Sequence, residues 1–323
     1  MNLGIVVPSF NRYPKTKRYL RCLEEQTDKD FKVYVVDSGS TDGTQTLVQE
    51  FKHLPIRLIT TSPKHWWAHN TNRGVKTALQ DGSTHIMTIN DDAIIKPDFL
   101  QKMKEIYERN HCRILGARID YANEPGKIWT LGGSCNWEGK HLYQPAYRNT
   151  WEHELPEEVR DKEIINTSLV CGDGTLIDVR IYEEVGFYQE KLCPHNHADF
   201  EFIIRVIQHG IKVFVAPQIV LYNDICNGNN SGILERKSKT IFEKILMEIQ
   251  TFYFTFFHKK SEDHLLSVAY IIFRYSPCGK RIKTLFLYLF DKILVLFITR
   301  YVSFTSKIIF RSGSAKSRIA VNE

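Results

Sequence analysis

The chain has 323 residues, 43% of them hydrophobic and 12% aromatic, which is enough to bury one large core or two smaller ones. Its formal charge of +6 is unevenly distributed. Residues 234–323 hold 16 Lys and Arg against 7 Asp and Glu and carry +9, so residues 1–233 carry −3. A mildly acidic N-terminal region followed by a basic, aromatic-rich C-terminal region indicates that the two regions have separate functions.

The composition also argues against several classes of protein. The seven Cys are scattered singly, which favours reduced thiols over a disulfide framework or a structural zinc site. The N-terminal apolar run has no basic segment before it and ends at Pro8, so it does not indicate a signal peptide, and we expect a cytoplasmic protein. No G-x-G-x-x-G motif or P-loop occurs, and no motif supports binding to nucleic acid.

Strand-like and helix-like segments alternate along the first third of the chain. Short apolar runs predict strands at residues 3–7, 31–36, 56–60 and 85–89. Between them, the patterns predict helices at residues 14–26, 44–51 and 68–80, and a further helix after Pro97. Because the strands are apolar throughout, we expect an α/β fold with a mainly parallel sheet covered by helices on both faces.

The pattern loosens after a strand-like segment at residues 113–118. Residues 120–161 are rich in Gly, Trp, Asn and Tyr and predict a hairpin and loop region. Regular structure resumes at residues 168–177, and it continues with a helix from Arg180, a helix at 198–208 and a strand at 211–215.

Polar loops follow three of the predicted strands, at residues 8–12, 37–43 and 90–92. The carboxyl ends of parallel strands lie along one edge of a sheet, where open α/β folds bind ligands. Adjacent Asp91 and Asp92 repel each other there unless a cation or a donor-rich ligand lies between them, although they can instead cap the next helix. Asp37 can accept a hydrogen bond from a ribose hydroxyl or a base N–H, or form an Asx turn.

The order of these segments carries a resemblance to a known family. Residues 5–12 (IVVPSFNR), 35–44 (VVDSGSTDGT), 72–74 (NRG) and 88–92 (TINDD) closely resemble the family 2 glycosyltransferases of the GT-A fold. Residues 171–177 (CGDGTLI), 185–187 and 198–205 are similar to the acceptor-side half of that family. The match covers roughly residues 2–225, and it looks most like the branch that includes rhamnosyl- and galactofuranosyltransferases.

The resemblance implies roles at the donor site. Asp37 matches the carboxylate that binds the nucleotide base. Residues 90–92 match the D-x-D segment, whose last residue, Asp92, holds Mg²⁺ or Mn²⁺ on the diphosphate of the sugar nucleotide. Asn90 replaces the first Asp, so the site has one negative charge fewer. The other residues expected to bind the nucleotide sugar are Pro8, Phe10, Arg12, Ser38, Trp66, Asn72, Asn90 and Asp91.

The resemblance also implies a catalytic base. Asp199 matches the carboxylate that accepts the proton of the acceptor hydroxyl in an inverting displacement. Asp199 also opens a predicted helix, so the alternative is an N-cap, and Glu201 is the fallback base. The family often has a metal-binding His after the last strand; the chain has none there, and Asp224 or Asn223 can substitute.

The resemblance implies an inverting, metal-dependent transferase that moves a sugar from a nucleotide-diphosphate sugar to a saccharide or lipid-linked saccharide, in the synthesis of a cell-surface polysaccharide. We expect a catalytic domain at residues 1–233, with a donor half up to about residue 118 and an acceptor half at 119–233. Two alternatives stay open. A sugar nucleotidyltransferase also needs carboxylates and a metal, and a catalytically silent protein can bind sugar nucleotides or act as a membrane scaffold.

The C-terminal region, residues 234–323, predicts amphipathic helices. Residues 241–257 and 285–310 are dense in Phe, Ile, Leu and Tyr, interleaved with Lys and Arg. The longest charge-free runs fall far short of the ~20 residues needed to span a bilayer. We expect peripheral contact with the inner face of the cell membrane; the alternatives are a helical appendage packed on the catalytic domain and a homodimer interface.

Overall fold

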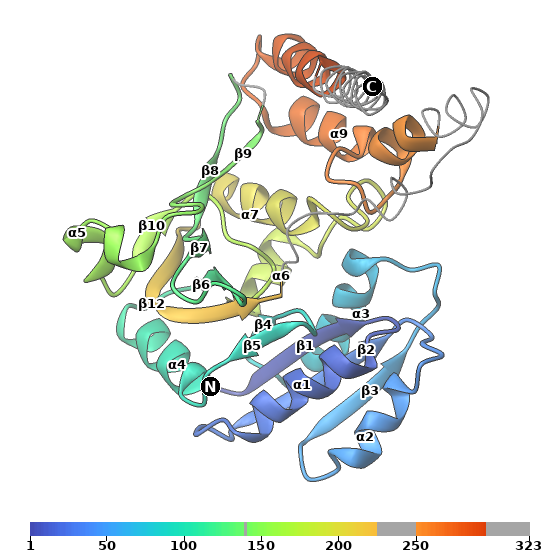
Figure 1. Ribbon diagram of the computed structural model, residues 1–323, viewed down its shortest axis with the longest axis vertical. Helices are drawn as coiled ribbons and strands as arrows, with labels where there is room; N and C mark the ends of the chain where they lie inside the picture. The colour runs from blue at the N-terminus through green and yellow to red at the C-terminus, as the bar shows by residue number, and fades with distance from the viewer. Residues whose placement is uncertain (139–140, 225–249, 295–323) are drawn as a thin grey trace, which may run out of the picture. The chain divides into compact units, whose positions relative to one another are not determined.

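The structure is a computed structural model that describes residues 1–138, 141–224 and 250–294 (Figure 1). The chain divides into two compact units. One comprises Met1–Cys135 and Tyr143–Ile271, and the other comprises Asn136–Leu142 and Ile272–Glu323. The domain boundary expected at residue 233 lies outside the described residues.

The first unit is built on a ten-stranded sheet with the order β10-β12-β6-β11-β4-β1-β2-β3, to which β5 and β7 add at the side. Its strands are β1 (Leu3–Ser9), β2 (Phe31–Asp37), β3 (Ile56–Thr60), β4 (His85–Thr88), β5 (Ala93–Ile95), β6 (Ile114–Tyr121), β7 (Ile128–Thr130), β10 (Ile165–Thr167), β11 (Thr175–Asp178) and β12 (Val213–Asn223). A separate hairpin pairs β8 (Gly133–Cys135) with β9 (Tyr143–Pro145).

Helices follow most of the strands. They are α1 (Tyr13–Glu24), α2 (Leu47–Glu50), α3 (Trp67–Gln80), α4 (Phe99–Arg109), α5 (Glu157–Arg160), α6 (Arg180–Val185), α7 (Ala198–Gln208) and α9 (Leu265–Tyr275), with 3₁₀ turns at Thr44–Thr46 and Glu152–Glu154. Residues 250–257 and 281–294 are also helical.

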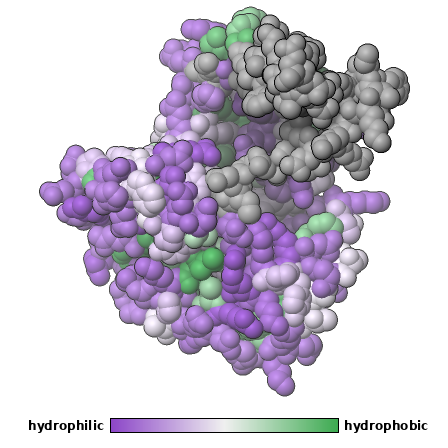
Figure 2. Space-filling model, in the orientation of Figure 1, coloured by the Kyte–Doolittle hydropathy of each residue, from purple (hydrophilic) through white to green (hydrophobic). Residues whose placement is uncertain are grey.

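The buried strands β1 and β2 carry apolar side chains on both faces, and helices cover each face. Leu3, Ile5 and Val7 of β1 join the same core cluster as residues of α1, α2 and α4. Val6 points to the other face, because side chains alternate along a strand, and it meets Gly74 of α3. Figure 1 shows α1 and α3 on opposite sides of this part of the sheet. On the face shown in Figure 2, the surface of the first unit is mainly hydrophilic.

The predicted α/β fold with helices on both faces is confirmed, and the sheet proves to be mixed. β1, β2, β3 and β4 pair in parallel, as expected. The predicted segment at residues 168–177 overlaps β11, which runs antiparallel to both β4 and β6. Its first residue, Thr175, lies opposite Thr88 at the end of β4. The loop that precedes β11 therefore reaches the same edge as the loops that follow β1, β2 and β4.

Candidate active site

The loops that follow β1 and β2 are tied to each other at the carboxyl edge of the sheet. Ser9, the last residue of β1, pairs with Asp37 at the end of β2. Beyond the strands, the backbone N–H of Asn11 donates to Oγ of Ser40 at 2.8 Å, and the N–H of Thr41 donates to Oδ1 of Asn11 at 2.8 Å. These bonds hold the first two predicted donor loops together.

Asp37 is fully buried and is held by donors from its own loop. Its carboxylate accepts the backbone N–H of Gly39 and of Ser40, each at 3.1 Å, and the side-chain amide of Gln45 at 2.7 Å. Gln45 itself is exposed. Its amide is thus the one donor of the three that an incoming ligand can replace without disturbing the backbone. The neighbouring Ser38 is buried, and its Oγ accepts a hydrogen bond from Asn70 at 2.7 Å.

Asp91 and Asp92 share one guanidinium. Arg12, from the loop between β1 and α1, places Nη1 2.6 Å from Oδ1 of Asp91 and Nη2 2.9 Å from Oδ2 of Asp92. Thr16 adds a hydrogen bond to Oδ2 of Asp91 at 3.0 Å. Burial raises the pKa of Asp91, and the positive charge of Arg12 opposes that shift. The predicted repulsion between the two carboxylates is therefore offset by a cation of the protein.

Asp92 and Asp224 also share a cation. Nζ of Lys15 lies 3.8 Å from Oδ2 of Asp92 and 3.3 Å from Oδ2 of Asp224, which follows β12. Nη2 of Arg18 lies 3.9 Å from the same Asp224 oxygen. Two carboxylates from distant parts of the chain therefore face one positive group. Lys15 and Arg18 carried no recognisable signal in the sequence.

Asp92 and Asp224 suit a hard divalent cation. Among the described residues, no group of three or more His, Cys, Asp and Glu side chains is arranged to hold a metal ion. Mg²⁺, however, commonly takes only one or two carboxylates and completes its shell with water and substrate phosphates. The Lys15 ammonium marks a position where positive charge is stabilised by Asp92 and Asp224 together. The residues present therefore fit a metal that is shared with a diphosphate.

Asn90 is held from two sides. Its Oδ1 accepts the indole N–H of Trp67 at 3.0 Å, and its backbone N–H donates to Oδ1 of Asp173 at 2.8 Å. The other oxygen of Asp173 accepts a hydrogen bond from Asn223 at 2.7 Å. Asn90 thus connects α3, the end of β4 and the loop before β11. An Asp at this position would place a third negative charge beside Asp92 and Asp173.

Asp173 is a buried carboxylate that sequence reasoning did not single out. Burial, together with the negative charge of Asp92, raises its pKa to about 7. The signal was present in the sequence as an acidic residue between Gly172 and Gly174, directly before a buried strand. Its meaning depends on the antiparallel direction of β11, which the sequence pattern did not reveal.

Asp199 lies in the first turn of α7 and is oriented by two backbone donors. Its Oδ2 accepts the N–H of Gly172 at 2.8 Å, and its Oδ1 accepts the N–H of Phe200 at 2.9 Å. Burial raises the pKa of Asp199. The fallback residue Glu201 is buried and bound by Arg205 through contacts of 3.0 Å. This engagement favours Asp199 as the carboxylate available to a substrate.

Trp67 links Asp199 to the donor side of the edge. Gly172 lies so close to both residues that a Cβ on it would come within 2.7 Å of the Trp67 ring and 3.1 Å of Cβ of Asp199. Only glycine permits this approach. The same indole holds Asn90, as described above, so one rigid side chain spans the space between the predicted metal segment and the predicted base.

Four predicted donor-site residues lie apart from this hydrogen-bonded group. Asn72 is buried, and its amide bonds the backbone of Tyr188 and the carboxylate of Glu190. Phe10 is exposed, and Pro8 lies within β1. Trp66 packs its ring edge-on against His195, with ring centroids 6.0 Å apart.

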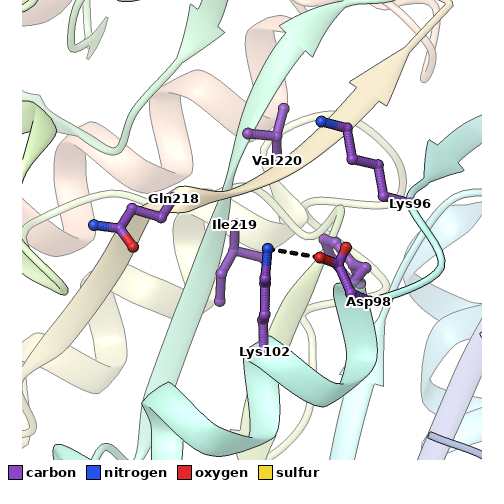
Figure 3. Close-up of a pocket in the computed structure, with 7 residues that line it drawn as sticks. Lys96, Asp98, Lys102, Gln218, Ile219 and Val220 are labelled. Atoms are coloured by element: carbon purple, nitrogen blue, oxygen red, sulfur yellow. Dashed lines mark ion pairs between the residues drawn. The ribbon is translucent and has the colours of Figure 1, made fainter. Parts of the chain in front are cut away.

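A shallow hollow lies elsewhere on the first unit, between the start of α4 and β12 (Figure 3). Asp98 and Lys102 form an ion pair at 2.6 Å within it. None of the predicted site residues lines this hollow. Its walls come from residues 96–102, at and just before the start of α4, and from residues 218–220 of β12. Because no predicted site residue lies there, the hollow does not compete with the carboxylate edge as a candidate active site.

Comparison with known proteins places the chain in a family. The family model described as "Glycosyl transferase family 2" matches residues 4–186, more than half of the chain. The chain belongs to glycosyl transferase family 2. This membership and the GT-A-type fold confirm the two main predictions from the sequence.

Individual members of the family 2 transferases are distant from this chain. A Haemophilus influenzae protein described as an uncharacterized glycosyltransferase is 25% identical over 207 residues, and the match spans 64% of this chain and 62% of that protein. The dTDP-rhamnosyl transferase RfbF of Shigella flexneri is 20% identical over 224 residues, 69% of each chain.

Two solved structures show the fold. GalNAc-T7 with UDP, GalNAc and Mn²⁺ has a TM-score of 0.56 at 12% identity and covers 69% of this chain and 44% of its own. S. aureus TarS 1-349 in complex with UDP-GlcNAc has a TM-score of 0.51 at 13% identity and covers 88% of this chain and 79% of its own.

The raised pKa of Asp173 predicts a stability that depends on pH. A carboxyl group with a folded-state pKa of about 7 binds its proton more tightly than in the unfolded chain, for which the usual value is 3.8. Its contribution to the free energy of unfolding therefore falls as pH rises from about 4 to 7, by at most about 1.4 kcal/mol per pH unit. Chemical denaturation of the metal-free protein across this range should show that slope.

Asp173→Asn should remove this part of the slope. Asp161→Asn, at an exposed position, is the matched control and should leave the slope as in the parent protein. Equal slopes in the parent protein and in Asp173→Asn would contradict the assignment.

Proposed function

We propose that this protein is an inverting, metal-dependent glycosyltransferase that moves a sugar from a nucleotide-diphosphate sugar to a saccharide or lipid-linked saccharide. The observation that carries the proposal is the convergence of Asp37, Asp92 and Asp199 on one side of the sheet, with Trp67 and Asn90 linking the last two. RfbF, a dTDP-rhamnosyl transferase, supports the donor class, and we propose that the product belongs to a cell-surface polysaccharide. UDP or UDP-GlcNAc in structures of the same fold agrees with that donor class.

The donor binds across the loops that follow β1, β2 and β4. The base hydrogen-bonds Asp37 in place of the Gln45 amide. The diphosphate lies beside Asp92 and receives Arg12 as a second cationic partner, since this guanidinium already reaches the edge of the site. Asp92 and Asp224 would hold Mg²⁺ or Mn²⁺, which neutralises charge on the leaving diphosphate. Asp91 keeps Arg12 in position through its short ion pair.

Asp199 serves as the general base. The acceptor hydroxyl oxygen forms a bond to the anomeric carbon on the face opposite the diphosphate, and the bond from that carbon to the phosphate oxygen breaks. The hydroxyl proton passes to Asp199, and the nucleoside diphosphate leaves. The raised pKa of Asp199 strengthens it as a base, because a carboxylate with a higher proton affinity accepts the proton more readily.

Asp199→Asn tests the base. We expect kcat to fall by about 10³-fold, since general base catalysis contributes roughly 10²- to 10⁴-fold, while donor affinity stays within about twofold. Release of nucleoside diphosphate, measured with UDP-, GDP- and dTDP-sugars and a panel of saccharide acceptors, gives the rate, and calorimetry gives the affinity. Glu157→Gln, at an exposed position, is the control. Turnover close to normal in Asp199→Asn would remove this residue from the mechanism.

Asp92→Asn tests the metal site. In the parent protein, Mg²⁺ or Mn²⁺ should tighten nucleoside diphosphate binding relative to binding in EDTA. Loss of the Asp92 carboxylate should abolish most of that enhancement, because one of two protein ligands loses its charge. Asp98→Asn, which alters an ion pair in the hollow described above, should keep the full enhancement. An unchanged ratio of the two affinities in Asp92→Asn would rule out the metal assignment.

The proposal extends to membrane contact through the C-terminal region. Of the segments expected to be amphipathic, only residues 250–257 and 285–294 fall within the described part of the chain. There, the helical residues 281–294 expose Ile282, Phe286, Phe290 and Ile293, whose spacing places them on one helix face. Basic residues such as Lys283 lie on the same segment. An apolar face bordered by Lys and Arg suits an anionic bilayer surface.

None of the helices in the described part of the chain has the length and apolar character needed to cross a membrane.

Replacing Phe286 and Phe290 together by Ser in the full-length protein should weaken co-flotation with anionic phosphatidylserine vesicles at least tenfold. The reason is that burial of each exposed Phe side chain in the membrane interface contributes about 1.5–3 kcal/mol to the free energy of binding. Leu266→Ser, at an exposed position on α9, is the control. Equal flotation of all three proteins would refute this face as the contact.

A further inference from the structure

A group of basic side chains surrounds Trp66 at the start of α3. The rings of His195 and His258 lie edge-on to the indole, with centroids 6.0 Å and 5.8 Å away. Nζ of Lys260 lies over the ring, 5.8 Å from its centroid. We call Trp66, His195, His258 and Lys260 the Trp66 cluster. All three of its basic residues, His195, His258 and Lys260, lie outside the family match at residues 4–186.

Hydrogen bonds fix the segment that supplies His258 and Lys260. Asn196 donates to the backbone carbonyl of Lys260 at 2.7 Å, and Nε2 of His197 lies 2.7 Å from the carbonyl of Glu262. These contacts join residues 258–264 to the loop that leads directly into α7. The segment is thus bound to the loop that directly precedes Asp199, and its basic side chains lie beside Trp66 at the start of α3.

The charge around the Trp66 cluster is one-sided. The permanent charges that act most strongly on His195 are those of Lys260 and Arg12, which are both positive. Burial first, and then these neighbours, lower the pKa of His195 to about 4, so its ring is neutral at neutral pH, and its Nδ1 lies 3.2 Å from Oδ1 of Asn196, which can only accept its N–H. Among the described residues, no carboxylate forms an ion pair with Lys260. Arg12 connects the cluster to the carboxylate edge, because it also binds Asp91 and Asp92.

Such an arrangement favours an anion with several oxygens. Lys260 supplies a mobile point charge, and Nε2–H of His258, whose Nδ1 accepts the backbone N–H of Lys260 at 3.2 Å, supplies a donor on one side of the indole. The indole gives a flat apolar wall against which a ring or an alkyl chain next to the anion can pack. A single carboxylate would meet only one of these two groups, whereas a diphosphate is long enough to meet both.

We propose that the Trp66 cluster is a diphosphate-binding site completed by the segment at residues 258–260. Two sources of this chemistry fit a glycosyltransferase: the nucleoside diphosphate of the donor and the prenyl diphosphate of a lipid-linked acceptor. The choice between these two sources rests on the proposed function. The binding of a diphosphate group does not rest on the proposed function, because it requires only the side chains of the Trp66 cluster.

Calorimetric titration of the full-length protein with inorganic pyrophosphate tests the site. Lys260→Gln should weaken binding about tenfold, the effect of one charge-assisted contact of roughly 1.4 kcal/mol. Lys259→Gln is the matched control: it makes the same chemical change at the neighbouring exposed position and should change affinity less than twofold. His258→Gln should weaken binding as well, by a smaller factor.

Titrations with UDP, GDP, dTDP and farnesyl diphosphate then identify the source. A loss confined to a nucleoside diphosphate assigns the cluster to the donor, and a loss confined to farnesyl diphosphate assigns it to the acceptor. Absence of pyrophosphate binding in the parent protein, or equal affinities in Lys260→Gln and Lys259→Gln, would overturn the proposal. If pyrophosphate binding depends on Lys260 but the protein transfers no sugar, the result would support this binding site and contradict the proposed transferase activity.

Discussion

Negative charge buried at one edge of the sheet is the constraint on which the rest of the site depends. Asp91 and Asp173 are almost fully buried, and Asp92 lies close to both. Carboxylates removed from water stay ionised only beside cations or hydrogen-bond donors. Arg12 supplies the cation for Asp91 and Asp92, and the backbone of Asn90 supplies a donor for Asp173. The sequence of the first loop and helix is therefore coupled to the residues that follow β4.

The same constraint explains how the edge can exchange protein cations for a substrate. Arg12 and Lys15 neutralise Asp92 from a loop and a helix that are partly open to solvent. A metal ion that arrives with a diphosphate supplies positive charge for the carboxylates, and the diphosphate supplies negative charge for Arg12. Arg12 can therefore turn from the carboxylates to the phosphates, and both the carboxylates and the phosphates keep a positively charged partner. Asn90 matters here because a third carboxylate would demand one more cation. Its amide oxygen is instead fixed by the indole of Trp67.

Two tryptophans that are adjacent in sequence belong to different parts of the site. Trp67 points inward, where it joins Asn90 to the close approach of Gly172 and Asp199. Trp66 points toward His195 and residues 258–260. The start of α3 therefore lies between the predicted catalytic residues and the Trp66 cluster. Through Trp66, it also contacts residues 258–260, whereas the rest of the candidate site is built from the first 224 residues.

The amino-acid sequence by itself determined the parallel half of the fold and most of the residues at its edge. Apolar runs that end abruptly in polar loops, such as the run before Asn90, predict buried strands and place their following residues together, because parallel strands share one carboxyl edge. Only the tertiary structure decided the direction of β11, and with it the place of Asp173, since the apolar pattern of a short strand does not reveal the direction in which it pairs. It also decided the roles of Lys15 and Lys260. A basic side chain has no pattern that reveals which distant charge or ring it will meet, and long-range packing alone brings these residues to the site.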